Sequence, residues 1–388
     1  MAAEVTAAAG ASVTLYDAMP SVGRKFLVAG RSGLNLTHEE DWEHFLNRYG
    51  GSNLPTAQWR EILSQFDNQR LRQWASELGI ETFVASSGKV FPKPVDGMIK
   101  AAPLLRRWVE RLRDLKVEFR LRHRWTAIDE DRNLSFKHDG EAITDQHDAI
   151  VLALGGASWP RTGSTGGWTK ILEASGIKIT PLEPANCGWE VEWPDALLNE
   201  AEGLPLKNLS VTAGELSRKG ELVITRYGLE GAPLYHLGPH IRNMAVPEIQ
   251  IDFKPSHSAE ELVNRLGQVR RNFVREAKRR WKLDPATASL LKHLPDRGPW
   301  TTSEQISQEV KHCRIPLIRP RPIEEAISTG GGVSWDELDQ NLMLRKYPGV
   351  FVAGEMIDWE APTGGYLLQG CFATGFHVGN AILKMHAS

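Results

Sequence analysis

The residues with the clearest chemical meaning lie near the C-terminus, in the segment VFVAGEMIDWEAPTGGYLLQG. A short apolar run is followed by two acids, Glu355 and Asp358, and then by Gly364 and Gly365, which lead into a helix expected from Tyr366 to residue 383. A helix N-terminus favours negative charge, and carboxylates can bind the hydroxyls of a sugar-like chain. The pattern therefore indicates an anion or cofactor site, although a strand, turn and packed helix of any α/β protein would look the same.

A second acid, Asp17, follows a strand predicted over residues 12–16, which itself follows an Ala-rich helix over residues 1–10. In dinucleotide-binding folds, an acid about 20 residues past a G-x-G-x-x-G loop binds the adenosine ribose. Counting back that far from Asp17 passes Met1, so we expect the first strand and its glycine fingerprint to be missing from this sequence. The alternative is an acid that only ends a strand at a turn.

The segment GRKFLVAGRSGLNLTH follows this strand and combines cations with glycines. Arg24 and Lys25 precede a loop that contains Gly33, and Asn35 and Thr37 come directly after it. Backbone N–H groups exposed by glycine and a nearby cation suit a pyrophosphate, and amide or hydroxyl side chains can contact a polar ring edge. A surface connection of the same composition is the alternative.

A third glycine-rich segment, VLALGGASWPRTGSTGGW, begins where an apolar run ends. Trp159, Pro160 and Arg161 interrupt its glycines, which argues against a second dinucleotide fingerprint and against a dedicated nicotinamide domain. We expect instead a loop that crosses a bound cofactor, with Gly155 and Gly156 allowing close approach.

The elements that would position these residues form an α/β domain. The continuous apolar runs Ile150–Leu154 and Val350–Ala353, with the strand before Asp17, are typical of a buried parallel sheet. Residues 42–78 and 102–115 are predicted helical, residues 81–94 a hairpin, and residues 117–144 a β-meander.

A different pattern begins near residue 187. It is β-rich over 187–250 and helical over 256–315, with capping boxes at residues 258–261 and 302–305. We expect an inserted domain over 187–323 between two parts of a discontinuous nucleotide-binding domain, residues 1–186 and 324–388.

Composition excludes several classes of protein. With a formal charge of −2 and 24% charged residues, the chain has no global attraction to nucleic acid or anionic lipid. Three cysteines far apart, no membrane span and no signal segment indicate a reduced, cytoplasmic chain. The twelve histidines show no metal-binding spacing. The basic segment 269–282 could suggest RNA, but Val269, Phe273, Ala277 and Trp281 recur every fourth residue, as in the core stripe of an amphipathic helix.

Together, GRKFLVAGRSGLNLTH, LALGGASWPRTGSTGG, ELVITRYGLEGAPLY, STGGGVSWDELD and VAGEMIDWEAPTGGYLLQGCFATG resemble the bacterial aminoacetone oxidase-like family of NAD(P)/FAD-dependent oxidoreductases. The resemblance covers nearly the whole chain. It implies a Rossmann-like FAD-binding domain with an inserted domain that combines a β-barrel and helices. Where many family members have Asn after the GGY motif, this chain has Leu367. The residues assigned to FAD are Asp17, Arg24, Lys25, Gly33, Asn35, Thr37, Gly155, Gly156, Gly354, Glu355, Asp358, Gly364, Gly365, Tyr366 and Gln369.

The resemblance implies an FAD-dependent oxidoreductase that acts on a small organic molecule. The flavin would transfer hydride or electrons, with NAD(P)H as a transient reductant or oxygen as an oxidant. No catalytic acid or base, metal site or oligomeric state can be assigned from the residues. The alternative is a flavin-fold protein without turnover that binds RNA through the basic segment 269–282.

Overall fold

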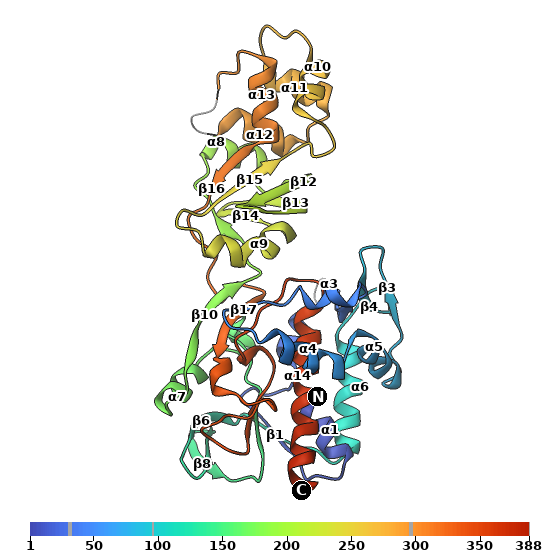
Figure 1. Ribbon diagram of the computed structural model, residues 1–388, viewed down its shortest axis with the longest axis vertical. Coiled ribbons are helices and arrows are strands. Elements are labelled where there is room, and N and C mark those ends of the chain that lie inside the picture. The colour runs from blue at the N-terminus through green and yellow to red at the C-terminus, as the bar shows by residue number, and fades with distance from the viewer. Residues whose placement is uncertain (30–32, 95–96, 295–297, 388) are drawn as a thin grey trace. The chain divides into compact units, whose positions relative to one another are not determined.

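The computed structural model describes residues 1–29, 33–94, 97–294 and 298–387. The chain divides into two compact units: unit 1 comprises residues 1–183 and 327–388, and unit 2 comprises residues 184–326. Both boundaries lie three residues from those expected. Figure 1 shows that the chain leaves unit 1 along strand β10 (Ile179–Ala185) and returns along β17 (Ser328–Val333), and these two strands pair with each other.

The described part of unit 1 contains two pairs of parallel strands. β1 (Thr14–Asp17) pairs with β5 (Glu118–Leu121), and β9 (Ile150–Leu152) pairs with β18 (Val350–Val352). Among the described residues, no ladder joins one pair to the other. β18 is fully buried, whereas β1 is only half-buried along its length, so the expectation of a buried strand is wrong there.

The predicted meander is shorter than expected because its first strand, β5, leaves to pair with β1. The antiparallel meander itself consists of three strands, β6 (Arg124–Ile128), β7 (Leu134–His138) and β8 (Glu141–Asp145). The remaining described elements between the meander and unit 2 are the short helices η1 (Pro160–Thr162) and α7 (Trp168–Ala174).

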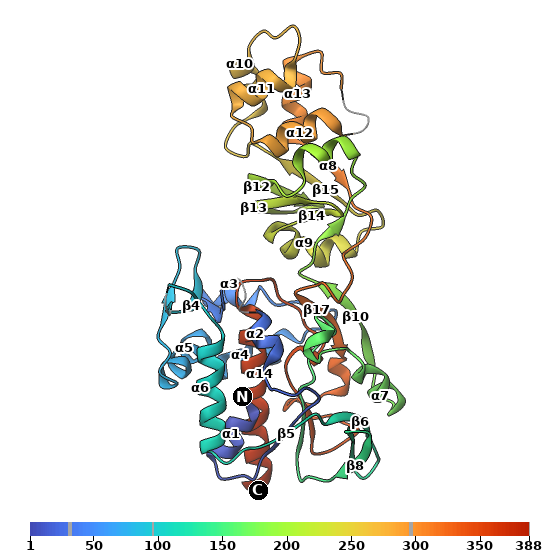
Figure 2. The same ribbon diagram turned by 180° about the vertical axis from the view of Figure 1, so that it is seen from behind.

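Three helices pack together in unit 1: α1 (Ala2–Ala8), α6 (Ala102–Asp114) and α14 (Tyr366–Ala387) (Figure 2). The small residues predicted along α14 allow α1 to approach it closely. A Cβ atom at Gly379 would lie 2.8 Å from Cβ of Val5, and one at Gly375 would lie 3.1 Å from Cβ of Met1. α14 is therefore a long, largely buried helix packed closely against α1, and its first turn is the start of this helix.

Helix α2 (Arg24–Ala29) precedes the predicted polar pair Asn35 and Thr37. Residues 30–32 of the expected glycine loop lie outside the described residues. Next comes β2 (Thr37–His38), which joins a small antiparallel sheet with the hairpin strands β3 (Thr82–Val84) and β4 (Lys89–Pro92). The intervening helices are α3 (Trp42–Leu46), α4 (Thr56–Gln65) and α5 (Asn68–Glu77). Asp41 and Asp67 cap α3 and α5 with their side chains.

The last part of unit 1 after β17 carries the acids of the C-terminal motif. Helix η2 (Trp335–Glu337) precedes β18, and helix η3 (Gly354–Met356) follows it directly. η3 thus places Glu355 at the carboxyl end of a parallel strand, which is where open α/β sheets bind ligands.

Unit 2 has its own core and a six-stranded antiparallel sheet in the order β11-β14-β13-β12-β15-β16. Its first strand also bonds to the chain just past its last strand, from Glu190 N to Arg319 O and from Ile318 N to Glu190 O, both 2.9 Å. The two edges therefore approach each other, as expected for a barrel-like sheet. The strands are β11 (Trp189–Glu190), β12 (Pro205–Ala213), β13 (Leu216–Thr225), β14 (Gly228–Glu230), β15 (Glu248–Asp252) and β16 (Cys313–Pro316).

The helices of unit 2 confirm the expected capping boxes at Ser258 and Thr302. In α11, Phe273, Ala277 and Trp281 are buried, so these three residues of the expected apolar stripe are part of the core. Val269, the first residue of that stripe, lies before the helix and is only partly buried, so the expectation of one helix over 269–282 is wrong at its start. The helices are α8 (Asp195–Ala201), α9 (Ala232–Arg242), α10 (Ala259–Leu266), α11 (Phe273–Trp281), α12 (Pro285–His293) and α13 (Ser303–Lys311). None of the described helices in either unit has the length and apolar character needed to cross a membrane.

Candidate functional site

The carboxylate of Glu355 joins three of the motifs singled out from the sequence. It accepts hydrogen bonds from Lys25 Nζ at 2.8 Å, from the Gly156 backbone N at 3.1 Å and from the Thr329 backbone N at 3.0 Å. Gly354, which precedes it, has a φ of +76° that favours glycine. The structure therefore brings Lys25, the Gly155–Gly156 loop and Glu355 together at the end of β18.

The glycines of the 155–156 loop approach other parts of unit 1. A Cβ atom at Gly156 would lie 2.4 Å from Thr329 Oγ1, and one at Gly155 would lie 3.0 Å from Ser164 Oγ. Thr329 Oγ1 also accepts a hydrogen bond from Ala157 N at 2.9 Å. Close packing within the unit is thus one reason for these glycines, and Thr329 is a neighbour that the sequence did not reveal.

Asp17 is the last residue of β1, directly before a bend in the chain. Its carboxylate accepts a hydrogen bond from Met19 N at 2.8 Å, as the alternative reading of a turn acid requires. Burial raises its pKa above the ordinary value, although the Met19 N–H and the charge of Arg24 act in the opposite direction. Arg24 itself donates to Ser21 Oγ at 3.3 Å. The ribose role of Asp17 and the pyrophosphate role of Arg24 remain predictions.

Asp358 occupies the interior of unit 1. Its carboxylate accepts a hydrogen bond from Thr180 Oγ1 at 2.8 Å, and its backbone carbonyl accepts one from Trp335 Nε1 at 2.7 Å. Burial raises the pKa of Asp358, and the bond from Thr180 offsets this only in part. The observed contacts of Asp358 link β10 to the segment after β18.

Two chain segments cross at the start of α14, where the backbone of Gly365 lies against Thr37. A Cβ atom at Gly365 would lie 2.6 Å from both N and Cα of Thr37, and Gly365 has a φ of +94°. Gly364 has a φ of +133°. Only glycine allows this approach, so the GG pair positions residues 35–38 against residues 364–369. We call these two segments together the crossing.

The crossing contains an unusual group of polar atoms. Of the seven buried side-chain polar atoms without a hydrogen-bond partner among the described residues, four lie here: Asn35 Oδ1, Thr37 Oγ1, His38 Nδ1 and Gln369 Oε1. Gln369 Nε2 donates to the Phe66 carbonyl at 2.5 Å, which fixes Oε1 as the free end of that amide. A buried polar atom without a partner costs about 1–3 kcal/mol. Because buried polar atoms in native proteins nearly always have partners, these four atoms are candidates for binding a ligand.

The chemistry of these atoms can be compared with that of FAD. The Asn35 and Gln369 oxygens are acceptors, and the Thr37 hydroxyl can donate or accept. The ring and ribityl chain of FAD carry N–H and O–H donors together with carbonyl acceptors. The residues present therefore fit FAD.

Tyr366 is fixed by partners on several sides. Its hydroxyl donates to Glu40, which also accepts from Arg48 Nε at 3.1 Å and from Nη2 at 2.8 Å. The Tyr49 hydroxyl donates to the Tyr366 carbonyl at 2.9 Å. The His38 ring stacks on the Tyr366 ring, with centroids 5.3 Å apart. Sequence reasoning missed Glu40 and Arg48, since no spacing rule relates them to a residue more than 300 positions away.

The charges beside Tyr366 are set by this packing. Burial raises the pKa of Glu40, but the hydrogen bonds from Arg48 and Tyr366 outweigh burial, so the pKa lies below its ordinary value. Burial lowers the pKa of His38 more than the nearby Glu40 raises it. Glu40 is therefore an anion and His38 is neutral near pH 7.

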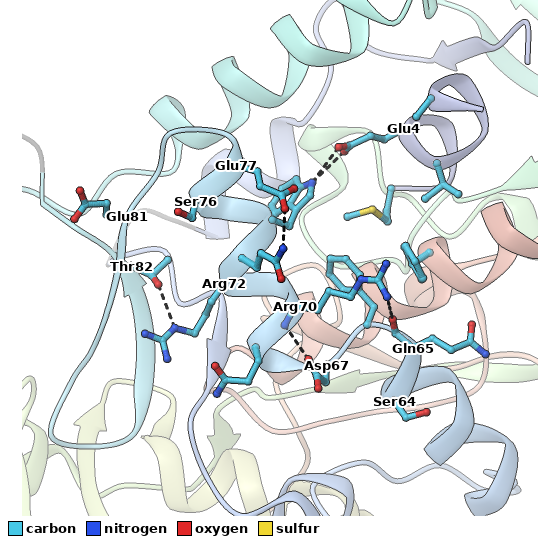
Figure 3. A pocket seen from close by; sticks show the side chains of 18 of the residues that line it. Glu4, Ser64, Gln65, Asp67, Arg70, Arg72, Ser76, Glu77, Glu81 and Thr82 are labelled. Carbon is cyan, nitrogen blue, oxygen red and sulfur yellow. Dashed lines mark hydrogen bonds between the residues drawn. The ribbon is translucent and has the colours of Figure 1, made fainter. Parts of the chain in front are cut away.

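A separate hollow of about 1110 Å³ lies between α1, α4 and α5 (Figure 3). Polar side chains in its lining bond to their neighbours, such as Gln73 to Glu77 at 3.0 Å and Arg72 to Thr82 at 3.3 Å. Arg70 N donates to Asp67 Oδ1 at 2.8 Å. None of the site residues predicted from the sequence lines this hollow.

Comparisons with known proteins agree with the architecture. The 3-dehydro-bile acid delta(4,6)-reductase of Clostridium scindens is 25% identical, over 96% of this chain and 92% of the relative. The ribosomal RNA dihydrouridine synthase of Haemophilus influenzae is 23% identical, over 95% of this chain and 91% of the relative. The open form of a flavocytochrome c3 fumarate reductase has a similar fold, with a TM-score of 0.50 and 12% identity over 100% of this chain and 76% of that structure.

The profile that describes the HI0933-like protein Rossmann domain matches residues 1–381, nearly the whole chain. The match confirms the family relationship and the Rossmann-like fold class expected from the sequence, and with them an enzyme of the FAD-dependent oxidoreductase class. The chain therefore belongs to the HI0933-like family of FAD-binding Rossmann proteins, which is related to flavin oxidoreductases.

Proposed function

We propose that this protein is an FAD-dependent reductase that adds hydrogen across a carbon–carbon double bond next to a carbonyl group in a small organic molecule. The observation that carries the cofactor assignment is the group of buried, unpartnered polar atoms at the crossing. The names of the two relatives support the reaction class, because a bile acid delta(4,6)-reductase and a dihydrouridine synthase both form products with a saturated ring bond.

The proposed binding residues fall into two groups. Asn35, Thr37 and Gln369 would hold the ring and ribityl part of FAD at the crossing, and Lys25 with Asp17 would bind its phosphates and ribose. Glu355 retains acceptor capacity beyond its three observed donors, and would bind a hydroxyl. When bound, FAD supplies hydride transfer, and NAD(P)H is the proposed electron donor. We retain the cytoplasm as the proposed location.

The experiment is a titration of the purified protein with FAD, followed by anaerobic addition of NADH or NADPH. We expect FAD uptake, loss of the flavin absorbance on reduction, and its return on addition of a 4-en-3-one steroid as a probe. Thr37→Val should weaken FAD uptake, whereas Thr374→Val, at an equally buried but fully bonded hydroxyl, serves as the matched control. A protein that takes up no FAD would contradict the proposal.

The second candidate is reduction of a uridine in RNA, which the exposed basic side of α11 favours. Arg275 and Lys278 are exposed on α11, opposite the buried stripe, and Arg271 is exposed just before the helix begins. This candidate predicts RNA binding that weakens steeply with salt. Arg275→Glu with Lys278→Glu should abolish it, whereas Lys207→Glu with Lys219→Glu, a matched charge reversal elsewhere on unit 2, should not. Salt-independent or absent RNA binding would reject the candidate.

A further inference from the structure

The orientation of the His38 ring is determined by its surroundings. Its Nε2 lies 3.0 Å from the carbonyl oxygen of Ser87, which can only accept, so Nε2 carries the proton in the neutral ring. One face of the ring stacks on Tyr366, and Tyr366 is itself held by Glu40. The ring therefore has a fixed tautomer and a fixed position.

This tautomer leaves a lone pair on Nδ1 without a donor. Nδ1 is buried and has no hydrogen-bond partner, and the nearest anion, Glu40 Oε1, lies 4.0 Å away. A carboxylate cannot donate to a lone pair, and this carboxylate already accepts from Arg48 and Tyr366. The surroundings of His38 thus fix its tautomer and its ring position but provide no hydrogen-bond donor for Nδ1.

Two other unpartnered atoms of the crossing also need a hydrogen-bond donor. Asn35 Oδ1 and Gln369 Oε1 are also acceptors, and both Thr37 and Gln369 are completely buried. All four atoms are screened from water. The ligand that satisfies the crossing must present several donors.

We propose that His38 Nδ1 accepts a hydrogen bond from a donor of bound FAD, its ring imide N–H or a ribityl O–H, so that FAD binds to the neutral form of His38. This inference rests on the proposed function. Protonation converts Nδ1 from an acceptor into a donor, and FAD affinity therefore falls as the pH drops through the pKa of His38.

Several charged or titratable groups face the His38 ring. Glu40, Arg48 and Lys89 are the charged groups that act on the ring, and Tyr366 is the titratable group stacked on it. Glu40 has a lowered pKa, whereas Arg48 and Tyr366 have raised ones, so none of these three titrates near neutral pH. The raised pKa of Asp17 and the lowered pKa of His377 add pH dependence of their own, which substitution of His38 leaves in place.

The test is the dissociation constant of FAD between pH 5 and 8, measured by flavin fluorescence for the wild type, His38→Phe and His38→Asn. His38→Phe keeps a ring but no acceptor, and should bind about 10-fold more weakly at pH 8, as expected for one lost buried hydrogen bond. His38→Asn restores an acceptor that does not titrate, and should bind nearly as well as the wild type. The wild type should converge on His38→Phe as the pH falls, while His38→Asn should not.

A 3-methyl analogue of FAD, which lacks the imide N–H, identifies the donor. If the imide donates, wild type and His38→Phe bind the analogue equally, and if a ribityl hydroxyl donates, the 10-fold difference persists. Equal pH dependence and equal affinity for FAD in wild type and His38→Phe would overturn the inference while leaving FAD binding intact. No FAD binding by the wild type at any pH would instead contradict the proposed function.

Discussion

Glu4 and the crossing are two buried polar regions of unit 1 that differ in how their atoms are bonded. The Glu4 carboxylate accepts from the indole N–H groups of Trp74, at 3.1 Å, and Trp108, at 2.6 Å, and from Arg111 at 3.0 Å. At the crossing, four buried atoms have no partner. Burial of polar groups alone therefore does not mark a ligand site, whereas several unpartnered polar atoms on two adjacent segments are a stronger indication of one. Glu4 is interpreted as structural and the crossing as functional.

The largest effect on stability is expected at Glu4, whose carboxylate is bonded by side chains of unit 1. Glu4→Ala leaves Arg111 and two indole N–H groups without their shared acceptor, and should lower the free energy of unfolding by about 4 kcal/mol. Urea denaturation measures this loss. Glu4→Gln keeps an acceptor and should lose less. A change below about 1 kcal/mol in Glu4→Ala would show that the cluster does not stabilise unit 1 in this way.

The backbone contact at the crossing comes next. Gly365→Ala places a methyl group against Thr37 in addition to the strain of a positive φ, and should cost about 3 kcal/mol together with most of the FAD affinity. Gly10 has a nearly identical φ of +92° and open space around it, so Gly10→Ala should cost only about 1 kcal/mol. Thermal unfolding with and without FAD compares the two. Equal losses would mean that the close approach to Thr37 is unimportant.

Two threonines with no exposed surface allow the sharpest comparison of partnered and unpartnered groups. Thr374 Oγ1 donates to the Gly370 carbonyl and accepts from Gly354 N, so Thr374→Val should cost about 1–2 kcal/mol. Thr37 Oγ1 has no partner, so Thr37→Val should leave the stability of the FAD-free protein unchanged or raise it by about 1 kcal/mol. Denaturant unfolding without FAD gives both values. Destabilisation by Thr37→Val would show that this hydroxyl is already bonded.

The smallest effect concerns two histidines, the half-buried His38 and the buried His377. Burial lowers the pKa of both His38 and His377, so their contribution to stability is present above the ordinary histidine pKa of 6.5 and is lost as the pH falls below it. Both His377 nitrogens have partners, Gln65 Oε1 at 3.0 Å and the Gln340 carbonyl at 2.9 Å. FAD should therefore lower the pKa of His38 further and leave that of His377 unchanged, as measured by NMR titration. A shift of both would contradict the comparison.

The sequence was sufficient to predict the main elements and their class. Continuous apolar runs gave the buried strands at residues 150–152 and 350–352, and local side-chain chemistry gave the capping boxes at Ser258 and Thr302. These features depend on neighbours along the chain. The departure of β5 to pair with β1 was missed, because pairing between distant strands depends on the whole sheet.

The candidate site was predicted in its parts but not in its contacts. Glycine-rich segments indicated where the chain comes close to something, and Gly365 does lie against Thr37. The contact of Lys25 with Glu355 and the bond from Tyr366 to Glu40 join residues more than 300 positions apart. No local pattern encodes such pairs, and Asp358 was assigned to the cofactor although its observed partner is Thr180.

A crystal structure of the protein with bound FAD tests the central claim most directly. We predict that FAD lies at the crossing and places donors within hydrogen-bond distance of Asn35 Oδ1, His38 Nδ1 and Gln369 Oε1, the acceptors that have no partner without it. FAD bound elsewhere, with these three atoms still buried and without partners, would contradict the assignment of the crossing as the flavin site.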